Sequence, residues 1–167
     1  VNMAPVYIGL LHYPIYNKHM EIVTTALTNY DLHDISRTAR TYNVSTYFII
    51  HPIEKQREMA YRVMNHWKSG YGTQYNPDRK DAFITTELVS DLETAVNTIE
   101  KECGKNPIVV TTDARVYPNT VGYPFIRKKI LEEENPIFIL FGTGFGMTKE
   151  MMKNFDYILE PIYGGRI

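Results

Sequence analysis

The sequence predicts an α/β fold with a mostly parallel sheet and helices on both of its faces. Short apolar runs alternate with segments of helical periodicity along the whole chain, and this alternation is typical of strand–helix–strand units. The run Ile137–Phe141, led in by Pro136, reads as a strand buried on both faces. A loop with three alternating glycines follows it, at positions 142, 144 and 146. We therefore expect a single domain over residues 1–167.

Six runs rich in apolar or β-branched residues read as strands. They are Val6–Leu11, Thr46–Ile50, Ala82–Thr85, Ile108–Thr112, Ile137–Phe141 and Tyr157–Leu159. Five segments between them read as helices: Asp31–Tyr42, Ile53–Lys68, Ser90–Cys103, Pro124–Glu134 and Thr148–Phe155. In the third helix, apolar residues recur at the i, i+3, i+4, i+7 spacing from Leu92 to Ile99, and Ser90 with Glu93 predicts a capping box. Thr148 is the expected cap of the fifth.

Composition limits the function classes. Apolar residues make up 44% of the chain and charged residues 22%, as in an ordinary globular domain. The formal net charge of -1 gives no overall attraction to nucleic acid or membrane, so an RNA-binding surface has to be a local patch. Cys103 is the only cysteine, which excludes an intrachain disulfide and fits a reducing cytoplasm. No apolar run approaches the length of a membrane span, and no histidine or carboxylate spacing indicates a metal.

Three predicted strands end in small or polar loops. They are the glycine loop, the segment Thr111–Arg115 and the segment Glu160–Arg166. The carboxyl ends of parallel strands meet at one edge of the sheet, so these loops together predict a ligand pocket. Taken singly, each loop fits a tight turn equally well. The glycine spacing matches neither the dinucleotide fingerprint nor a P-loop.

The first predicted helix carries an arginine that faces away from its core side. Leu32, Ile35, Ala39 and Tyr42 mark the apolar stripe, and Arg37 points roughly 170° away from its middle. By its spacing alone, Arg37 is best explained as an arginine on the solvent-exposed face of the helix.

Basic and aromatic residues interleave between Lys55 and Lys80, a pattern that fits either a local RNA patch or a solvated face. Trp67 falls on the apolar stripe of its helix and is expected to be buried. The following segment, Ser69–Asp81, reads as a loop with Gly70, Gly72 and Pro77.

Three of these segments resemble motifs of the SPOUT superfamily of RNA methyltransferases, in particular a small group related to domains fused to tRNA guanine-N1-methyltransferases. Asp31–Ala39 is similar to the first motif, with Arg37 at its functional arginine, and Phe141–Thr148 is similar to the second. Leu159–Gly164 resembles the opening of the third. The likeness spans nearly the whole chain, and the three motifs occur in the family's order.

The resemblance implies a trefoil knot in the C-terminal half, S-adenosylmethionine as cofactor, and a homodimer with its active site between subunits. It places Arg37 and Asp31 at the reacting centre. The cofactor-binding residues that it implies are Thr111, Thr112, Leu140, Phe141, Gly142, Thr143, Gly144, Gly146, Leu159, Pro161, Tyr163 and Gly164. Basic residues expected to contact RNA are Arg40, Arg62, Lys68, Arg79, Lys80 and Arg115.

The superfamily's pattern continues beyond its third motif, so we expect a C-terminal tail that this sequence lacks. The expected function is S-adenosylmethionine-dependent methylation of structured RNA, with tRNA as the expected substrate. Asp31 stands where many SpoU-like members have Asn, and base or ribose methylation both remain open. An alternative is a non-catalytic RNA-binding module that keeps the cofactor pocket, and a further one is an α/β nucleotide-binding protein. Preference for ATP over S-adenosylmethionine would favour the latter.

Overall fold

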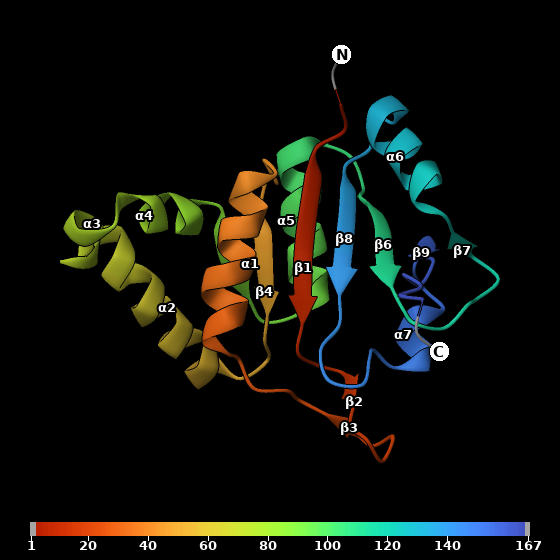
Figure 1. Ribbon diagram of the computed structural model, residues 1–167, viewed down its shortest axis with the longest axis horizontal. Coiled ribbons are helices and arrows are strands. Elements are labelled where there is room, and N and C mark those ends of the chain that lie inside the picture. Colours follow the sequence, from red (N-terminus) through yellow and green to blue (C-terminus); the bar gives the residue numbers. More distant parts are fainter. Residues whose placement is uncertain (1–2, 166–167) are drawn as a thin grey trace.

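A computed structural model of the protein describes residues 3–165, apart from the side chain of Thr73. Seven strands form one sheet in the order β5-β4-β1-β8-β6-β9-β7 (Figure 1). Every pairing within this sheet is parallel. The strands are β1 (Val6–Leu11), β4 (Tyr47–Ile50), β5 (Thr86–Val89), β6 (Ile108–Thr112), β7 (Thr120–Val121), β8 (Ile137–Phe141) and β9 (Tyr157–Leu159). An antiparallel hairpin, β2 (Ile15–Tyr16) with β3 (Ile22–Val23), follows β1.

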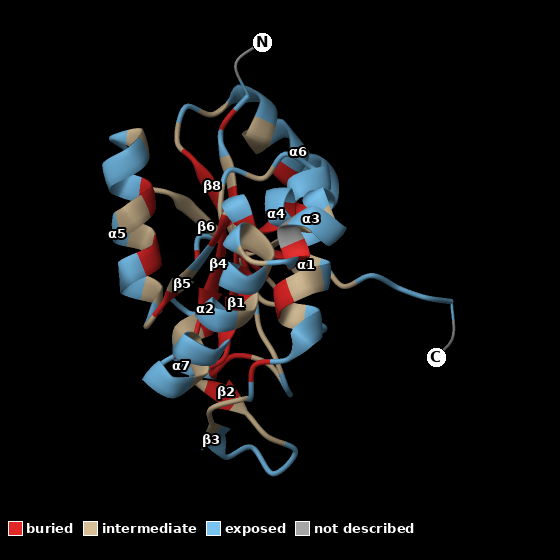
Figure 2. Cartoon of the chain, turned by 90° about the vertical axis from the view of Figure 1, so that its left-hand side faces the viewer, coloured by how far each residue is buried: buried red, intermediate tan, exposed pale blue. Residues whose placement is uncertain are grey.

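Seven helices connect the described strands and flank the sheet. They are α1 (Asn29–Thr41), α2 (Glu54–Ser69), α3 (Gly72–Tyr75), α4 (Pro77–Ile84), α5 (Leu92–Cys103), α6 (Tyr123–Glu132) and α7 (Lys149–Met152). Figure 2 shows α5 on one side of the sheet and α1, α4 and α6 on the other. None of the described helices combines the length and apolar character needed to cross a lipid bilayer.

Successive side chains of a strand point to opposite faces of the sheet, so the strands contribute to a core on each face. In β4, Phe48 and Ile50 join the core beneath α5 and α7, whereas Tyr47 and Ile49 join the core beneath α1, α2 and α4. A third cluster packs α6 against β6, β8 and β9. The predicted mostly parallel α/β sheet with helices on both faces is therefore confirmed.

The predicted strand at 82–85 is wrong. Ala82 and Phe83 lie in the last turns of α4, both buried, and the strand follows as β5. The preceding segment, expected as a loop, forms α3 and α4. Its glycines and proline predict turns, but Pro77 occupies the first helical position, where a missing N–H costs nothing. Phe83 then anchors the short helix in the core under α1 and α2.

Local details differ from prediction at three helix ends. Tyr42 is 79% exposed at the C-cap of α1, and Ser36 takes the buried position instead, accepting a hydrogen bond from the hydroxyl of Thr86 (2.7 Å). The cap of α5 is Asp91, which accepts from the Thr94 amide, so no Ser90–Glu93 box forms. Thr148 does cap α7, but this helix ends at Met152 rather than Phe155.

Candidate functional site

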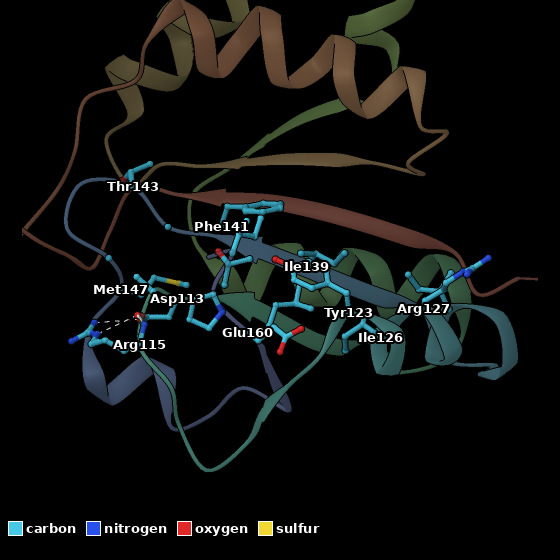
Figure 3. A pocket seen from close by; sticks show the side chains of 18 of the residues that line it. Asp113, Arg115, Tyr123, Ile126, Arg127, Ile139, Phe141, Thr143, Met147 and Glu160 are labelled. Atoms are coloured by element: carbon cyan, nitrogen blue, oxygen red, sulfur yellow. Dashed lines mark hydrogen bonds and ion pairs between the residues drawn. The ribbon is translucent and has the colours of Figure 1, made fainter. Parts of the chain in front are cut away.

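A cavity of about 1430 Å³ opens where three strand ends meet, beside α6. The ends of β6, β8 and β9 supply Thr112–Arg115, Phe141–Met147 and Leu159–Ile162. Ile139 and Phe141 of β8 form part of the apolar wall, on the face of the sheet between α1 and α6 (Figure 3). The three loops that the sequence singled out therefore line one pocket. Its volume exceeds the roughly 300–1,000 Å³ of ordinary ligand sites.

The glycine loop is held in place by the β2–β3 hairpin. The Phe145 amide donates to the carbonyl of Tyr16 (3.0 Å), and the Tyr16 amide donates to the carbonyl of Gly146 (2.9 Å). Gly144 and Gly146 have φ of 54° and 98°, which glycine adopts without strain. A Cβ on Gly144 would lie 3.0 Å from Cγ2 of Ile15 and 3.2 Å from the Tyr16 carbonyl oxygen. This glycine is therefore required by packing against the hairpin.

Gly146 has a different environment. A Cβ at this position would meet only Nη2 of Arg115, at 3.9 Å. Since Gly146 lines the cavity, its bare backbone leaves space on the ligand side of the loop.

The side chain of Thr143 anchors the glycine loop to neighbouring segments by hydrogen bonds. Its hydroxyl donates to the Leu11 carbonyl (3.0 Å) and is hydrogen-bonded to the hydroxyl of Thr25 (2.5 Å). The Thr25 amide donates in turn to the carbonyl of His12 (2.9 Å). A continuous hydrogen-bond network thus joins the cavity loop to the segment that precedes α1.

An ion pair between Asp113 and Arg115 lies at the end of β6. The carboxylate of Asp113 accepts from the amide, Nε and Nη2 of Arg115, at 2.8, 3.1 and 3.3 Å, and from the hydroxyl of Tyr117 at 3.1 Å. The hydrogen bond with Asp113 raises the pKa of Arg115, and burial together with the Asp113 charge raises the pKa of Tyr117. The carboxylate is therefore neutralised within the protein and orients the guanidinium.

Helix α6 forms the opposite wall, which sequence reasoning missed. Tyr123, Ile126, Arg127 and Ile130 line the cavity. The helix itself was predicted, but its own sequence carries no signal that one face meets a ligand site. Within the three loops that were expected to form the pocket, Asp113, Phe145, Met147, Glu160 and Ile162 also line the cavity, although they were not named individually as cofactor-binding residues.

The expected cofactor residues divide into three groups. Those that line the cavity are Thr112, Phe141, Gly142, Thr143, Gly144, Gly146, Leu159 and Pro161. Thr111 and Leu140 are fully buried beside it, where the Thr111 hydroxyl donates to the Leu140 carbonyl (2.8 Å). Tyr163 and Gly164 are exposed and lie outside the lining.

Asp31 serves as the third residue of a capping box. Its Oδ2 accepts from the amide of Thr28 (2.8 Å), while its own amide donates to the Thr28 hydroxyl (3.2 Å). The same Oδ2 lies 3.3 Å from Nε2 of His12, which is completely buried. Burial tends to raise the pKa of Asp31, but hydrogen bonds from His12 and Thr28 outweigh it and lower this pKa.

The ring of His12 faces an acceptor on each side. Its Nδ1 lies 3.1 Å from the carbonyl oxygen of Ile50, and its Nε2 faces Asp31. Both of these neighbours can only accept hydrogen bonds from the ring. The neighbouring ring of His51 accepts from the Ile53 amide at Nδ1 and lies 3.0 Å from the Thr25 carbonyl at Nε2, which suits its neutral form. Burial lowers the pKa of His51, and the His12 charge adds to this.

Arg37 is exposed on α1, as its position opposite the apolar stripe predicts. It lines a shallow surface depression with Asp34, Thr38, Thr41 and Tyr42, and it is not among the residues of the large cavity. Arg37 and the glycine loop of one chain are therefore not brought into one pocket.

Most of the basic residues expected to contact RNA lie on the helical flank, α1 to α4. Arg40 is on α1, Arg62 and Lys68 are on α2, and Arg79 and Lys80 are on α4, which packs against both. The guanidinium carbon of Arg79 lies 4.4 Å from the ring centroid of Trp67. Trp67 was expected to be buried, but it is only half-buried against the core. Arg115 is the exception, because it lines the cavity. Among described residues, no group of three or more His, Cys, Asp or Glu side chains could hold a metal.

The fold is similar to that of solved methyltransferase structures. A structure of a probable methylase family protein from Haemophilus influenzae Rd KW20 superimposes with a TM-score of 0.61 at 14% identity, over 99% of this chain and 58% of that chain. The SpoU methyltransferase AviRb from Streptomyces viridochromogenes, in complex with the cofactor AdoMet, gives 0.56 at 11% identity, over 100% and 52%. At these identities the likeness shows the fold, a mostly parallel α/β sheet of the SpoU methyltransferase type.

Sequence comparison gives the family. The chain belongs to the family described as SAM-dependent RNA methyltransferase, whose profile matches residues 5–166. An uncharacterized protein of Aquifex aeolicus is 45% identical over 95% of this chain and 78% of its own length. A tRNA (guanine-N(1)-)-methyltransferase of Oleidesulfovibrio alaskensis is 38% identical over 93% of this chain. The chain spans only 36% of that relative's length.

The cavity fits the family's cofactor, S-adenosylmethionine. Its apolar wall of Ile139, Phe141 and Leu159 suits the adenine ring, and the open side of Gly146 lets a ligand approach the backbone. The charged groups of the lining, Arg115 and Glu160 among them, suit the hydroxyl and amino-acid parts. The residues present are thus chemically suited to this molecule.

Proposed function

We propose that this chain is the catalytic domain of a methyltransferase that modifies tRNA. One observation carries the proposal. This chain belongs to an RNA methyltransferase family, and the three strand-end loops expected to form its site line one cavity suited to S-adenosylmethionine. The substrate is supported by the tRNA methyltransferase that is 38% identical over most of this chain. We include the superfamily's trefoil knot in the C-terminal half, supported by the likeness of the fold to SpoU methyltransferases.

When bound, the cofactor supplies an electrophilic methyl group, so the protein has to position an acceptor and exclude water. In this proposal the backbone of Gly142–Gly146 and the β9 end from Leu159 to Pro161 hold the cofactor. Thr111 and Leu140 support these loops from beneath, through the bond between the Thr111 hydroxyl and the Leu140 carbonyl. Tyr163 and Gly164 would close over the mouth from the segment that follows β9.

Arg37 supplies the second half of the proposed site. Because it does not line the cavity of its own chain, we place it at the cavity of a second copy in a homodimer. A guanidinium stays protonated in proteins, so Arg37 orients the acceptor nucleotide and stabilises its charge. Asp31, whose Oδ2 is engaged by Thr28 and His12, is a positioning residue that fixes the start of the helix carrying Arg37.

The helical flank then binds the body of the RNA. Arg40, Arg62, Lys68, Arg79 and Lys80 lie on helices that contact one another. Their charges would neutralise phosphates, and the exposed ring of Tyr61 offers a stacking surface. The cytoplasm, where tRNA is found and where a free Cys103 stays reduced, is the proposed location.

The test is methyl transfer from labelled S-adenosylmethionine to bulk tRNA taken from a strain that lacks the gene. We expect incorporation into tRNA, with none into tRNA from the parent strain as the matched control, and nuclease mapping of the product then identifies the nucleotide. Cofactor binding without transfer to any RNA would show a non-catalytic module. Tighter binding of ATP than of S-adenosylmethionine would contradict the cofactor assignment itself. Sedimentation of a monomer at micromolar concentration would contradict the dimer.

A further inference from the structure

The guanidinium of Arg115 is oriented by the protein yet keeps hydrogen-bond donors for a ligand. Of its five N–H donors, Nε–H and one on Nη2 are directed at Asp113. Among residues 3–165, no acceptor contacts Nη1. The Asp113 side chain is 8% exposed and that of Arg115 is 44% exposed, so the carboxylate is inside and the cation is accessible.

Arg115 also lies at one defined place in the cavity. Its Nη2 is 3.9 Å from the position of a Cβ on Gly146, beside the part of the glycine loop that leaves room for a ligand. Figure 3 shows Arg115 and Arg127 at opposite ends of the cavity, with Ile139 and Phe141 between them. The cavity thus has an arginine at each end, with Arg115 next to the glycine loop, and an apolar middle.

We propose that Arg115 binds the carboxylate of the methionine part of the cofactor and makes the site selective for ligands that carry this group. The inference rests on the proposed function, because it assumes that S-adenosylmethionine occupies the cavity. A planar guanidinium pairs with a carboxylate through parallel N–H···O bonds. The apolar wall would then take the adenine, at a distance from the charged end.

A phosphate of the RNA is the other oxyanion that Arg115 could meet. Two observations favour the carboxylate. Asp113 bonds the guanidinium of Arg115 beside the glycine loop, and the ring centroid of Tyr117 lies 5.9 Å from the guanidinium carbon. The other basic residues expected to contact RNA lie on α1 to α4.

The test compares two ligands that differ only in the carboxylate: S-adenosylmethionine and its decarboxylated form. Calorimetry would be done with the wild type, Arg115→Ala, Arg115→Lys and Arg127→Ala, the last being a matched control at the other end of the cavity. We expect Arg115→Ala to weaken S-adenosylmethionine binding by about 10- to 100-fold. Its affinity for the decarboxylated ligand should stay within about twofold of wild type, and Arg115→Lys should fall between.

Other results would overturn the inference. An equal loss for both ligands would mean that Arg115 shapes the cavity instead of recognising the carboxylate. Unchanged cofactor binding with weakened tRNA binding would assign the guanidinium to an RNA phosphate. If Arg127→Ala produced the ligand-specific loss, the carboxylate would lie at the opposite end. A wild type that binds neither ligand would overturn the proposed function as well, whereas binding that is independent of Arg115 would overturn this inference alone. Thermal unfolding of each variant shows that the comparison is made on folded protein.

Discussion

The cavity and the helical flank are built in opposite ways. At the cavity, backbone loops are fixed by hydrogen bonds such as those of Thr143 and Tyr16, and glycines leave space for a ligand. On α1 to α4, basic and aromatic side chains are exposed to solvent, and Tyr71 and Tyr75 are each nearly 80% exposed. The contrast teaches that a small-molecule site depends on an exact backbone, whereas an RNA surface depends on charge and accessible rings. Substitutions at the cavity should therefore lower both stability and ligand binding. Substitutions on the flank should lower function while leaving stability nearly unchanged.

The largest expected effect is at Gly144. Gly144→Val puts a branched side chain at positive φ, against Ile15 and the Tyr16 backbone. We expect a loss of about 3 kcal/mol or more in the free energy of unfolding, and no measurable S-adenosylhomocysteine binding. Chemical denaturation and calorimetry measure the two quantities. Gly146→Ala is the matched control: its Cβ has space, so only backbone strain of about 1 kcal/mol is expected. Unchanged stability and affinity in Gly144→Val would remove this loop from the site.

Arg37→Ala tests whether the flank separates function from folding. Methyl transfer should fall by about 100-fold or more, roughly 2.7 kcal/mol of barrier, because the acceptor loses its orienting group. The free energy of unfolding should change by less than about 0.5 kcal/mol, since Arg37 is exposed. Single-turnover transfer and thermal unfolding on one preparation measure both, with cofactor affinity as a control. An active, equally stable variant would leave Arg37 as a surface residue.

Asp31→Asn tests the structural link beneath α1. The pKa of Asp31 is lowered in the folded protein, so its charge stabilises the fold at pH values above the ordinary carboxyl pKa. This stabilisation is lost as the pH falls through the folded-state pKa. We expect the variant to be about 1–2 kcal/mol less stable than wild type at pH 7, with the difference shrinking as the pH falls through the lowered folded-state pKa of Asp31. Urea unfolding between pH 7 and pH 3 measures it, with the exposed Asp34→Asn as control. A pH-independent difference would show that the charge on Asp31 plays no part.

The smallest effect is expected within the basic flank itself. Arg79→Ala removes a cation held 4.4 Å from the ring centroid of Trp67 and should cost about 0.5–1 kcal/mol of stability. Arg62→Ala changes an exposed residue and should cost less than about 0.5 kcal/mol. Both should weaken tRNA binding to a similar extent and reduce its salt dependence. A tRNA affinity unchanged in both variants would exclude α2 and α4 from the RNA surface.

Sequence reasoning succeeded where a local rule decides the structure. The strand Ile137–Phe141 and the glycines after it follow from apolar content and backbone freedom, and both were predicted. The strand was expected to be buried on both faces, but Ile139 and Phe141 face the cavity and are not fully buried. Failure came where tertiary packing decides. The eight-residue α4 is too short for a periodic signal and is held by the burial of Phe83.

Within the site, strand alternation separates the residues that were expected to meet the cofactor. Thr111 and Leu140 are completely buried beneath the cavity. Their neighbours Thr112 and Phe141 line the cavity instead. Whether α6 lines the cavity depends on which face of the sheet the chain crosses. The sequence of the helix does not indicate that face.

The bonds between the β2–β3 hairpin and the glycine loop have a thermodynamic consequence. A loop with three glycines has high conformational entropy when it is unrestrained. The main-chain hydrogen bonds of Tyr16 with Phe145 and Gly146 order the loop, so this entropy is lost during folding. Ligand binding then begins from an ordered loop and carries little further entropic cost. Residues of the hairpin that never contact a ligand thereby contribute to its affinity, because loosening the hairpin would transfer the cost of ordering the loop from folding to binding.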